Sequence, residues 1–515
     1  MALGTTRWGR TVWIAAIAAF VARFPGLLWP LRPDEAGFLL VARSLHPEPD
    51  SLYGRYWVDR PPPVIWLVQA TDWVGGAYTH RLVGALACAL LVLASAAATR
   101  ETALRAGVVD PVAVRRLAGW VAVGTAALVS NAQIDPVAAK GEVLGIPLVL
   151  ASCWLSLRAV RRLAAADAFW AGCLAVLAVG FKQSILGGIV FGAVLLLGSA
   201  AARHLPGRTA GRFALAAVAG GAVPVAVVVA WTLASGSRLQ TLWYTSVSFR
   251  SDASRVIASQ NSEGAQSRIG VLVVVFVGVG MLLLLVCFLV RVPSLVRHDA
   301  VPVVAILAMV TVDLLGVAFS GSFWLPYLFV LVPPLSLALA ALVAHDHLGL
   351  SRHRVSPAVV AVVATSSVLS LVAWTAAWAV GRVPVEVRTG EAIAAAARPG
   401  DRVLVYGGRA DIQWASRAES PYPYLWSLPM RTLDPDLEEL RRVLTGSNPP
   451  TWFVEATHIT AWSELGTRPI ERSLISKYEF VRTACGRYRI YHLNSVDPID
   501  VDVDCSTPYR TIWGS

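Results

Sequence analysis

Charged residues are scarce in this sequence. Only 15% of its 515 residues are Asp, Glu, Lys or Arg, against about 25% in an average soluble domain, and the mean hydropathy is +0.59. This scarcity excludes a disordered or fibrous protein and argues against a water-soluble enzyme. The six cysteines and nine histidines form no cluster along the chain, so the composition gives no support to a dedicated zinc site.

Apolar residues are abundant instead, in blocks of roughly 20, the length that crosses the hydrocarbon core of a bilayer. Eleven spans are predicted, at residues 11–28, 80–99, 118–134, 141–157, 168–184, 185–200, 213–235, 270–290, 300–319, 323–343 and 357–380. The first block could be a secretory signal, but it ends in Trp29-Pro30 without a small-residue cleavage site, so we expect a retained span. The sequence therefore predicts a polytopic α-helical membrane protein with about 11 transmembrane helices.

The connections between the predicted spans differ in charge. Arginines gather in alternate connections, at residues 100–117, 158–166, 201–212, 291–299 and 345–356. Because short cytoplasmic loops carry an excess of basic residues, we expect a multi-pass protein of the plasma (inner) membrane with a cytoplasmic N-terminus. The long loops 31–79 and 236–269 and the C-terminal part are then extracytoplasmic. These arginines explain the formal charge of +11, so it does not indicate a nucleic-acid partner.

The composition changes near residue 383. Residues 1–382 are predicted to form a transmembrane module, and residues 383–515 a separate extracytoplasmic domain of mixed α/β structure. Short apolar runs predict its strands, at 402–406 and 452–455 and in a hairpin at 478–493 that turns at Gly486.

The cysteines fall into two groups under this topology. Cys485 and Cys505 lie in the predicted outer domain, and the other four lie in predicted spans. An extracytoplasmic compartment is oxidising, so we expect a disulfide between Cys485 and Cys505.

Two charged motifs lie in the first long outer loop. Asp34 and Glu35 follow the first span directly. Adjacent carboxylates can bind a divalent metal ion (Mg, Mn or Ca), accept a proton from a hydroxyl, or do both, but they can also simply begin a solvated loop. Further on, Arg60 precedes the rigid run Pro61-Pro62-Pro63 and an apolar helix. A guanidinium held there suits a lipid phosphate, because it offers two parallel donors.

These motifs resemble, in their order, the GT-C glycosyltransferases that use polyprenyl phosphates, the superfamily of protein O-mannosyltransferases and lipid A aminoarabinose transferases. The acidic pair and the Arg60 motif are similar to its first-loop elements. Three later pieces are also similar to its motifs: Asp135 in 131–136, Lys182 in 180–183, and Tyr327 in 325–335. The resemblance covers about residues 10–345. The chain departs from the pattern at Arg60, where lysine is common, and at Pro326, where histidine or lysine often precedes the tyrosine.

The resemblance implies a role for each of these residues. Asp34 is expected to act as general base, with Glu35 supporting it or helping to bind a metal. Arg60 and Lys182 are expected to hold the donor phosphate, and Asp135 to position the sugar or the acceptor. The predicted substrate-binding set also contains Lys140, Glu142, Gln183 and Tyr327.

Some of these charges have plainer explanations. Lys140 and Glu142 could form an ion pair at a loop edge, and Lys182 could extend its amine to the headgroups, as we expect of Arg23. Asp313, inside a predicted span, could cap a neighbouring helix instead of serving the reaction.

The predicted function is sugar transfer from a polyprenyl monophosphate to an extracytoplasmic cell-wall glycan, glycolipid or protein. Only three of the 44 basic residues are lysine, which indicates a GC-rich, actinobacterial genome and hence mannose or arabinofuranose as the sugar. The alternatives are a transporter or lipid flippase, and a scaffold whose outer domain binds a partner. A transporter is expected to show internal repeats and charges at mid-membrane, which the sequence lacks, and a scaffold leaves the acidic pair unexplained.

Overall fold

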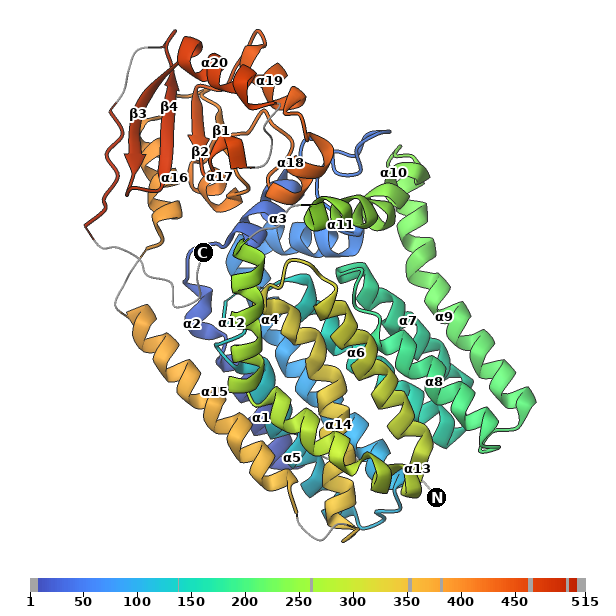
Figure 1. Ribbon diagram of the computed structural model, residues 1–515. Coiled ribbons are helices and arrows are strands. Elements are labelled where there is room, and N and C mark those ends of the chain that lie inside the picture. Colours follow the sequence, from blue (N-terminus) through green and yellow to red (C-terminus); the bar gives the residue numbers. More distant parts are fainter. Residues whose placement is uncertain are drawn as a thin grey trace.

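The computed structural model describes residues 8–137, 139–259, 263–350, 354–379, 383–461, 466–496 and 500–506. Most of the chain forms a bundle of helices, and a C-terminal α/β region, residues 385–506, sits on one end of it (Figure 1). The bundle and its connections contain α1 (Arg10–Val21), α2 (Phe24–Leu27), α3 (Pro33–Arg43), α4 (Pro62–Arg105), α5 (Pro111–Ser130), α6 (Gly141–Arg162), α7 (Ala165–Phe181), α8 (Gly187–Ala201), α9 (Gly207–Ala234), α10 (Leu239–Trp243), η1 (Tyr244–Ser248), α11 (Phe249–Ser259), α12 (Glu263–Gly278), α13 (Met281–Ala318), η2 (Leu325–Leu331), α14 (Val332–His347) and α15 (Ser356–Ala379).

Eight helical segments in the described residues are long and apolar enough to cross a membrane, and three shorter apolar helices accompany them. The prediction of a polytopic helical protein is therefore confirmed, whereas the count of about 11 is not. The predicted span 270–290 is divided, because α12 ends at Gly278 and α13 begins at Met281. Gly280 between them has φ +85°, a left-handed conformation that glycine adopts without strain.

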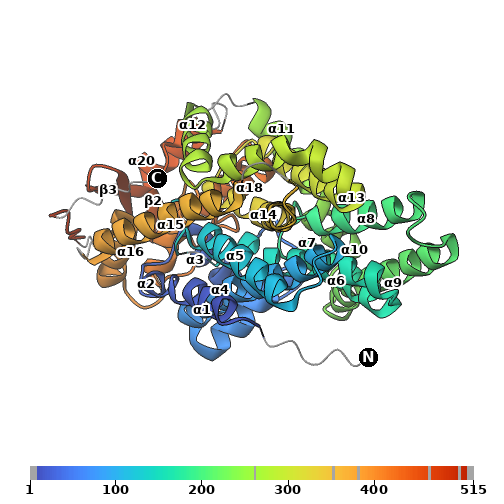
Figure 2. The same cartoon turned by 90° about the horizontal axis from the view of Figure 1, so that it is seen from below.

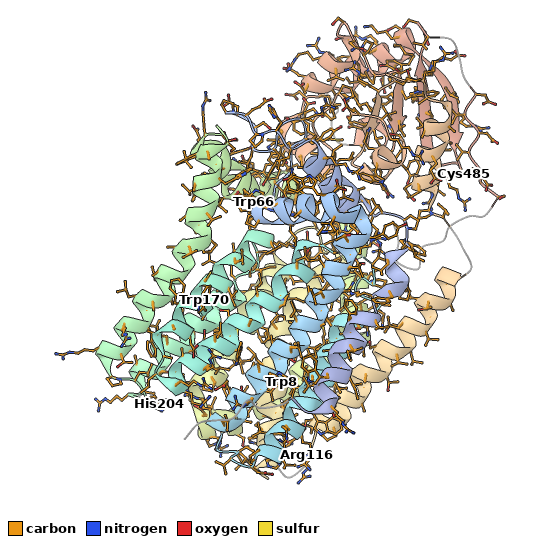
Figure 3. The ribbon with its side chains drawn as sticks, turned by 180° about the vertical axis from the view of Figure 1, so that it is seen from behind. Trp8, Trp66, Arg116, Trp170, His204 and Cys485 are labelled. Carbon is orange, nitrogen blue, oxygen red and sulfur yellow. A yellow bond between two sulfur atoms is a disulfide. The ribbon has the colours of Figure 1, made fainter. Side chains whose placement is uncertain are left out.

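The longest helix, α4, changes direction at Gly75 and Gly76, where the backbone angles are not helical. Its first part, from Pro62, therefore lies outside the predicted span 80–99, within the predicted outer loop. Arg116 and His204 lie at the end of the bundle that is away from the C-terminal region, which contains Cys485 (Figure 3). The arginine-rich connections thus gather at the end opposite the C-terminal region.

Helix α14 forms the centre of the bundle, as the view along the bundle shows (Figure 2). Residues 325–347, which include it, are almost entirely buried, 94% over their most apolar window. Polar side chains also pair inside the bundle, as where Thr125 on α5 donates to the Ser336 hydroxyl at 2.9 Å. This packing holds the ends of the surrounding helices in fixed positions beneath the C-terminal region.

The C-terminal region contains a four-stranded sheet of order β1-β2-β4-β3, in which β1 and β2 are parallel and the other pairs antiparallel. Its elements are α16 (Val385–Ala396), β1 (Val403–Tyr406), α17 (Ala410–Ala415), α18 (Ser427–Leu433), α19 (Glu438–Thr445), β2 (Trp452–Glu455), η3 (Ile459–Ala461), α20 (Thr467–Lys477), β3 (Tyr478–Ala484) and β4 (Tyr488–Leu493). The predicted strands and hairpin are confirmed. The edge strand β1 and its neighbour β2 are buried on both faces by the helices that cover the sheet. Cys485, at the hairpin turn, forms a disulfide with Cys505.

Candidate active site

Helix α3 brings the acidic pair to the boundary between the bundle and the C-terminal region (Figure 1). It begins at Pro33, which suits the first helical position because an N–H there would have no partner in the helix. Asp34 and Glu35 follow in the first turn, where the helix dipole favours negative charge. Successive side chains on a helix point about 100° apart, so the two carboxylates face different neighbours.

Asp34 faces the start of α6 and the C-terminal region. Its Oδ2 accepts a hydrogen bond from Lys140 Nζ at 2.8 Å, and its Oδ1 accepts one from Trp426 Nε1 at 3.0 Å. Burial alone would raise the pKa of Asp34, but Lys140 and Arg60 outweigh it and lower the pKa to about 2. The side chain is 34% exposed. Asp34 is therefore an anion at neutral pH whose side chain is only partly buried.

Glu35 points the other way, into the protein. Its carboxylate accepts two hydrogen bonds from Arg81 of α4, at 2.8 and 3.0 Å, and only 1% of its side chain is exposed. Burial would raise the pKa of Glu35, but Arg81 holds it at about 2. Arg81 also donates to the backbone carbonyls of Gly26 and Pro30. The Glu35–Arg81 ion pair thus connects α2 and α3 to α4 and fixes the position of Asp34 on α3.

Lys182 lies where α7 ends beside the start of α4. Gly180 makes this approach possible, since a Cβ there would come within 2.9 Å of Pro63 Cγ. The Lys182 amine donates to Glu142 and lies 3.7 Å from the centre of the Tyr327 ring. Burial lowers the pKa of Lys182 to about 8, although Glu142 partly offsets it. The structure therefore brings these predicted residues together around one amine.

Arg60 lies just before α4, in the same group of charges. It donates to the Asp59 carboxylate at 2.6 Å, and Arg250 of α11 pairs with the same carboxylate at 2.8 Å. Gln183 donates to the Asp59 backbone carbonyl at 2.8 Å. Burial would lower the pKa of Arg60, but Asp59 and Asp34 raise it. Asp59 thus links two guanidinium groups and the loop after α7, near Asp34.

Asp135 is more deeply buried than Asp34. It is 2% exposed, accepts a hydrogen bond from Arg32 at 3.1 Å, and accepts another from the backbone N–H of Val137 at 3.0 Å. It therefore holds the residue that precedes α3. The expectation that Arg23 extends to the headgroups is wrong. Arg23 is 5% exposed and donates to the Asp135 backbone carbonyl at 2.8 Å, because the loop offers carbonyls that lipid would not.

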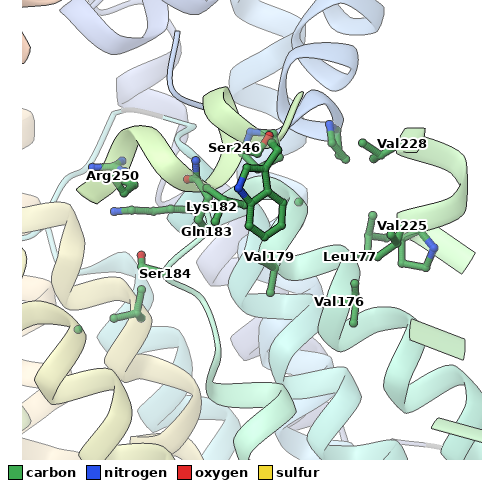
Figure 4. A pocket seen from close by; sticks show the side chains of 18 of the residues that line it. Val176, Leu177, Val179, Lys182, Gln183, Ser184, Val225, Val228, Ser246 and Arg250 are labelled. Atoms are coloured by element: carbon green, nitrogen blue, oxygen red, sulfur yellow. The ribbon is translucent and has the colours of Figure 1, made fainter. Parts of the chain in front are cut away.

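An elongated cavity of about 820 Å³ opens beside these charges. Its wall is largely apolar and comes from α7, α9 and α13, including Val176, Val225 and Val228. Lys182, Gln183 and Arg250 lie on one side of it, opposite Val176, Val225 and Val228 (Figure 4). The cavity therefore joins an apolar channel to a group of cations. Asp313 also lines it and is 4% exposed.

The acidic pair does not fit a shared metal ion. The Asp34 oxygens accept from Lys140 and Trp426, and both Glu35 oxygens accept from Arg81. No group of three or more His, Cys, Asp or Glu side chains that could hold a metal occurs in the described ranges. We therefore derive no reaction step from a metal.

A chelator tests this conclusion. We expect the rate of the reaction proposed below to stay within about twofold after treatment with 1 mM EDTA, because a lysine and two arginines already supply positive charge that suits a phosphate. A rate that disappears with EDTA and returns with Mg or Mn would contradict the expectation. Lys182→Ala, assayed in EDTA, is the control, because it shows how the rate responds when a cation is lost from the site.

No protein-family model and no curated protein matches the chain. Several solved structures do match it. ArnT from Cupriavidus metallidurans, bound to undecaprenyl phosphate, has a TM-score of 0.58 and 14% identity, covering 93% of this chain and 97% of that one. The Archaeoglobus fulgidus oligosaccharyltransferase, in complex with Zn and sulfate, has a TM-score of 0.54 and 13% identity, covering 94% and 73%. AglB from Archaeoglobus fulgidus, with an inhibitory peptide and a dolichol-phosphate, has a TM-score of 0.50 and 13% identity, covering 95% and 74%.

These neighbours define the class of the fold. All three are structures of GT-C proteins, and the likeness extends over nearly the whole chain, including the C-terminal region. The chain therefore has the GT-C fold, a polytopic helical bundle with an added α/β region, and the resemblance predicted from the sequence is confirmed at the level of fold.

Proposed function

We propose that the protein is an integral membrane glycosyltransferase that moves a sugar from a polyprenyl monophosphate to an extracytoplasmic acceptor. One observation carries the proposal: the largely apolar cavity also contains Lys182 and Arg250, and Arg250 shares Asp59 with Arg60, which interacts with Asp34. A polyprenyl chain suits the apolar wall, and its phosphate suits the cations. The known ligands of two structural neighbours, undecaprenyl phosphate and dolichol-phosphate, support this choice of donor.

The proposed reaction needs one base and one stabilised leaving group. Asp34 accepts the proton of the acceptor hydroxyl as its oxygen forms a bond to the anomeric carbon. The bond between that carbon and the phosphate oxygen breaks, and polyprenyl monophosphate leaves with the bonding electrons. Lys182, Arg250 and Arg60 stabilise the charge that develops on the phosphate. Lys140 keeps Asp34 ionised and oriented until the proton arrives.

A second cavity supports a carbohydrate as the acceptor. It measures about 1270 Å³ and lies between the C-terminal region and the residues around α2 and α3. Its lining combines aromatic rings, among them Tyr56 and Tyr78, with charged groups of both signs, such as Arg417 and Glu391. Aromatic faces and hydrogen-bonding groups suit the apolar faces and hydroxyls of sugars. We propose a cell-wall glycan as acceptor, with mannose or arabinofuranose as donor sugar, and residues 383–515 on the same, outer side of the membrane as Asp34.

The ionisation of Lys182 predicts how donor binding depends on pH. Its pKa of about 8 means that the amine loses its proton, and its attraction for phosphate, as pH rises through 8. We expect the affinity for undecaprenyl phosphate to fall about 10-fold between pH 7 and pH 9.5, measured in nanodiscs by intrinsic fluorescence. Lys182→Arg keeps its charge at both pH values, so its affinity should hardly change. An equal fall in both proteins would contradict the assignment.

The proposed function is tested by direct transfer. Purified protein in nanodiscs is given polyprenyl-phosphoryl mannose or arabinofuranose, with cell-wall glycan fragments as acceptor, and the products are identified by mass spectrometry. We expect a glycosylated fragment and free polyprenyl monophosphate with at least one donor. Donor that moves to the other leaflet of a vesicle without losing its sugar would support a flippase instead.

A further inference from the structure

The segment that connects α17 to α18 in the C-terminal region lies against the first predicted outer loop. Tyr56 accepts a hydrogen bond from the backbone N–H of Ser420 at 3.0 Å, and the backbone N–H of Trp57 donates to the Pro423 carbonyl at 3.0 Å. Arg55 pairs with Glu419. These contacts fix residues 419–424 on the loop that leads to Arg60, and the chain then reaches α3 two residues later.

Trp426, the residue before α18, lies directly on α3. Its ring centre is 5.6 Å from that of Phe38, and a Cβ on Gly37 would come within 2.3 Å of its Cζ2. The indole thus occupies space that only a glycine leaves open. Its Nε1 donates to Asp34 Oδ1 at 3.0 Å. The C-terminal region therefore contacts the proposed base itself, besides packing on the bundle.

We propose that the C-terminal region completes the active site by supplying Trp426, whose N–H fixes the Asp34 carboxylate in the orientation that the acceptor hydroxyl needs. The inference rests on the proposed function. A carboxylate held at one oxygen can rotate about its side-chain bonds, whereas Asp34 is held at both, by Lys140 and by Trp426. An oriented base acts on a bound hydroxyl without first paying for its own ordering. Trp426 is in this sense a positioning residue, because it acts through Asp34.

The test separates this role from simple packing. Trp426→Phe keeps a ring on Phe38 and Gly37 but lacks the N–H, and we expect its kcat to fall about 10-fold with KM for the donor unchanged within twofold. Trp452→Phe is the matched control. Trp452 also donates its indole N–H to a carboxylate, that of Asp401 at 3.2 Å, but it lies inside the C-terminal sheet. Its kcat should match that of the wild type.

A second variant approaches the same contact from the other side. Gly37→Val leaves Trp426 intact but occupies the space of its ring, so it should lower kcat by a similar factor while KM for the donor again holds. Wild-type kcat in either folded variant, or an equal loss in Trp426→Phe and Trp452→Phe, would overturn the inference. Failure of the wild type to transfer sugar would instead count against the proposed function.

Discussion

Asp34→Asn is expected to lower the rate of sugar transfer about 1000-fold and to leave the affinity for polyprenyl phosphate within about twofold. The amide has nearly the shape of the carboxylate, but only one of its two terminal atoms is an acceptor, so it keeps the hydrogen bond from Lys140 or the one from Trp426 and loses the other. It cannot take a proton from the acceptor. The loss should therefore appear in kcat, measured as release of polyprenyl monophosphate, while donor binding is measured separately.

A matched acidic residue controls for the loss of negative charge. Asp50 lies in the same predicted outer loop, 31–79, is 78% exposed, and pairs with the exposed Arg238. Asp50→Asn should transfer sugar at the wild-type rate. If Asp34→Asn also transferred at that rate, Asp34 would not be the base, even if the protein proved to be a glycosyltransferase.

The largest expected effect on stability is that of Arg81→Met. This change leaves Glu35 buried, at 1% exposure, without its cation. Breaking a buried ion pair on one side costs about 3–5 kcal/mol of unfolding free energy. We expect a loss of this size in denaturant unfolding of the protein in detergent. Arg238→Met, which breaks an exposed pair, should cost less than about 1 kcal/mol.

The double variant Arg81→Met with Glu35→Leu distinguishes the pair from the packing around it. Replacing both partners with apolar side chains removes the unpaired charge, so most of the lost stability should return. If the double variant were as unstable as Arg81→Met alone, the backbone carbonyls bound by Arg81 would account for the effect. A mild effect of Arg81→Met itself would contradict a structural role of the pair.

Much of the fold was predictable because it depends on local sequence. Blocks of roughly 20 apolar residues give the bundle helices, and short apolar runs give the strands. The boundaries were less predictable where backbone geometry decides them. Gly75 and Gly76 extend α4 beyond the predicted span through a change of direction, and Gly280 separates two helices within the predicted span 270–290. A hydropathy pattern contains no information about such angles.

The site was predictable where its residues belong to short motifs. Asp34, Arg60 and Lys182 were named from their neighbours in sequence, and the structure places them together. Which carboxylate of the pair is exposed depends on helix rotation. The role expected of Asp135 stays a prediction, and its ion pair with Arg32 gave no signal in the sequence. Trp426 was missed, because 392 positions separate it from Asp34. Residues 421–426 are rich in proline and aromatic residues, but this composition does not indicate which residue Trp426 contacts.

The most direct test of the central claim follows the oxygen between the anomeric carbon and the phosphate of the donor. The donor is synthesised with ¹⁸O at this position, and the lipid and sugar products are weighed by mass spectrometry after transfer. If the sugar is transferred through attack on its anomeric carbon, the label stays in the polyprenyl monophosphate. Label in the sugar product would show cleavage at phosphorus and would contradict the proposed glycosyl transfer.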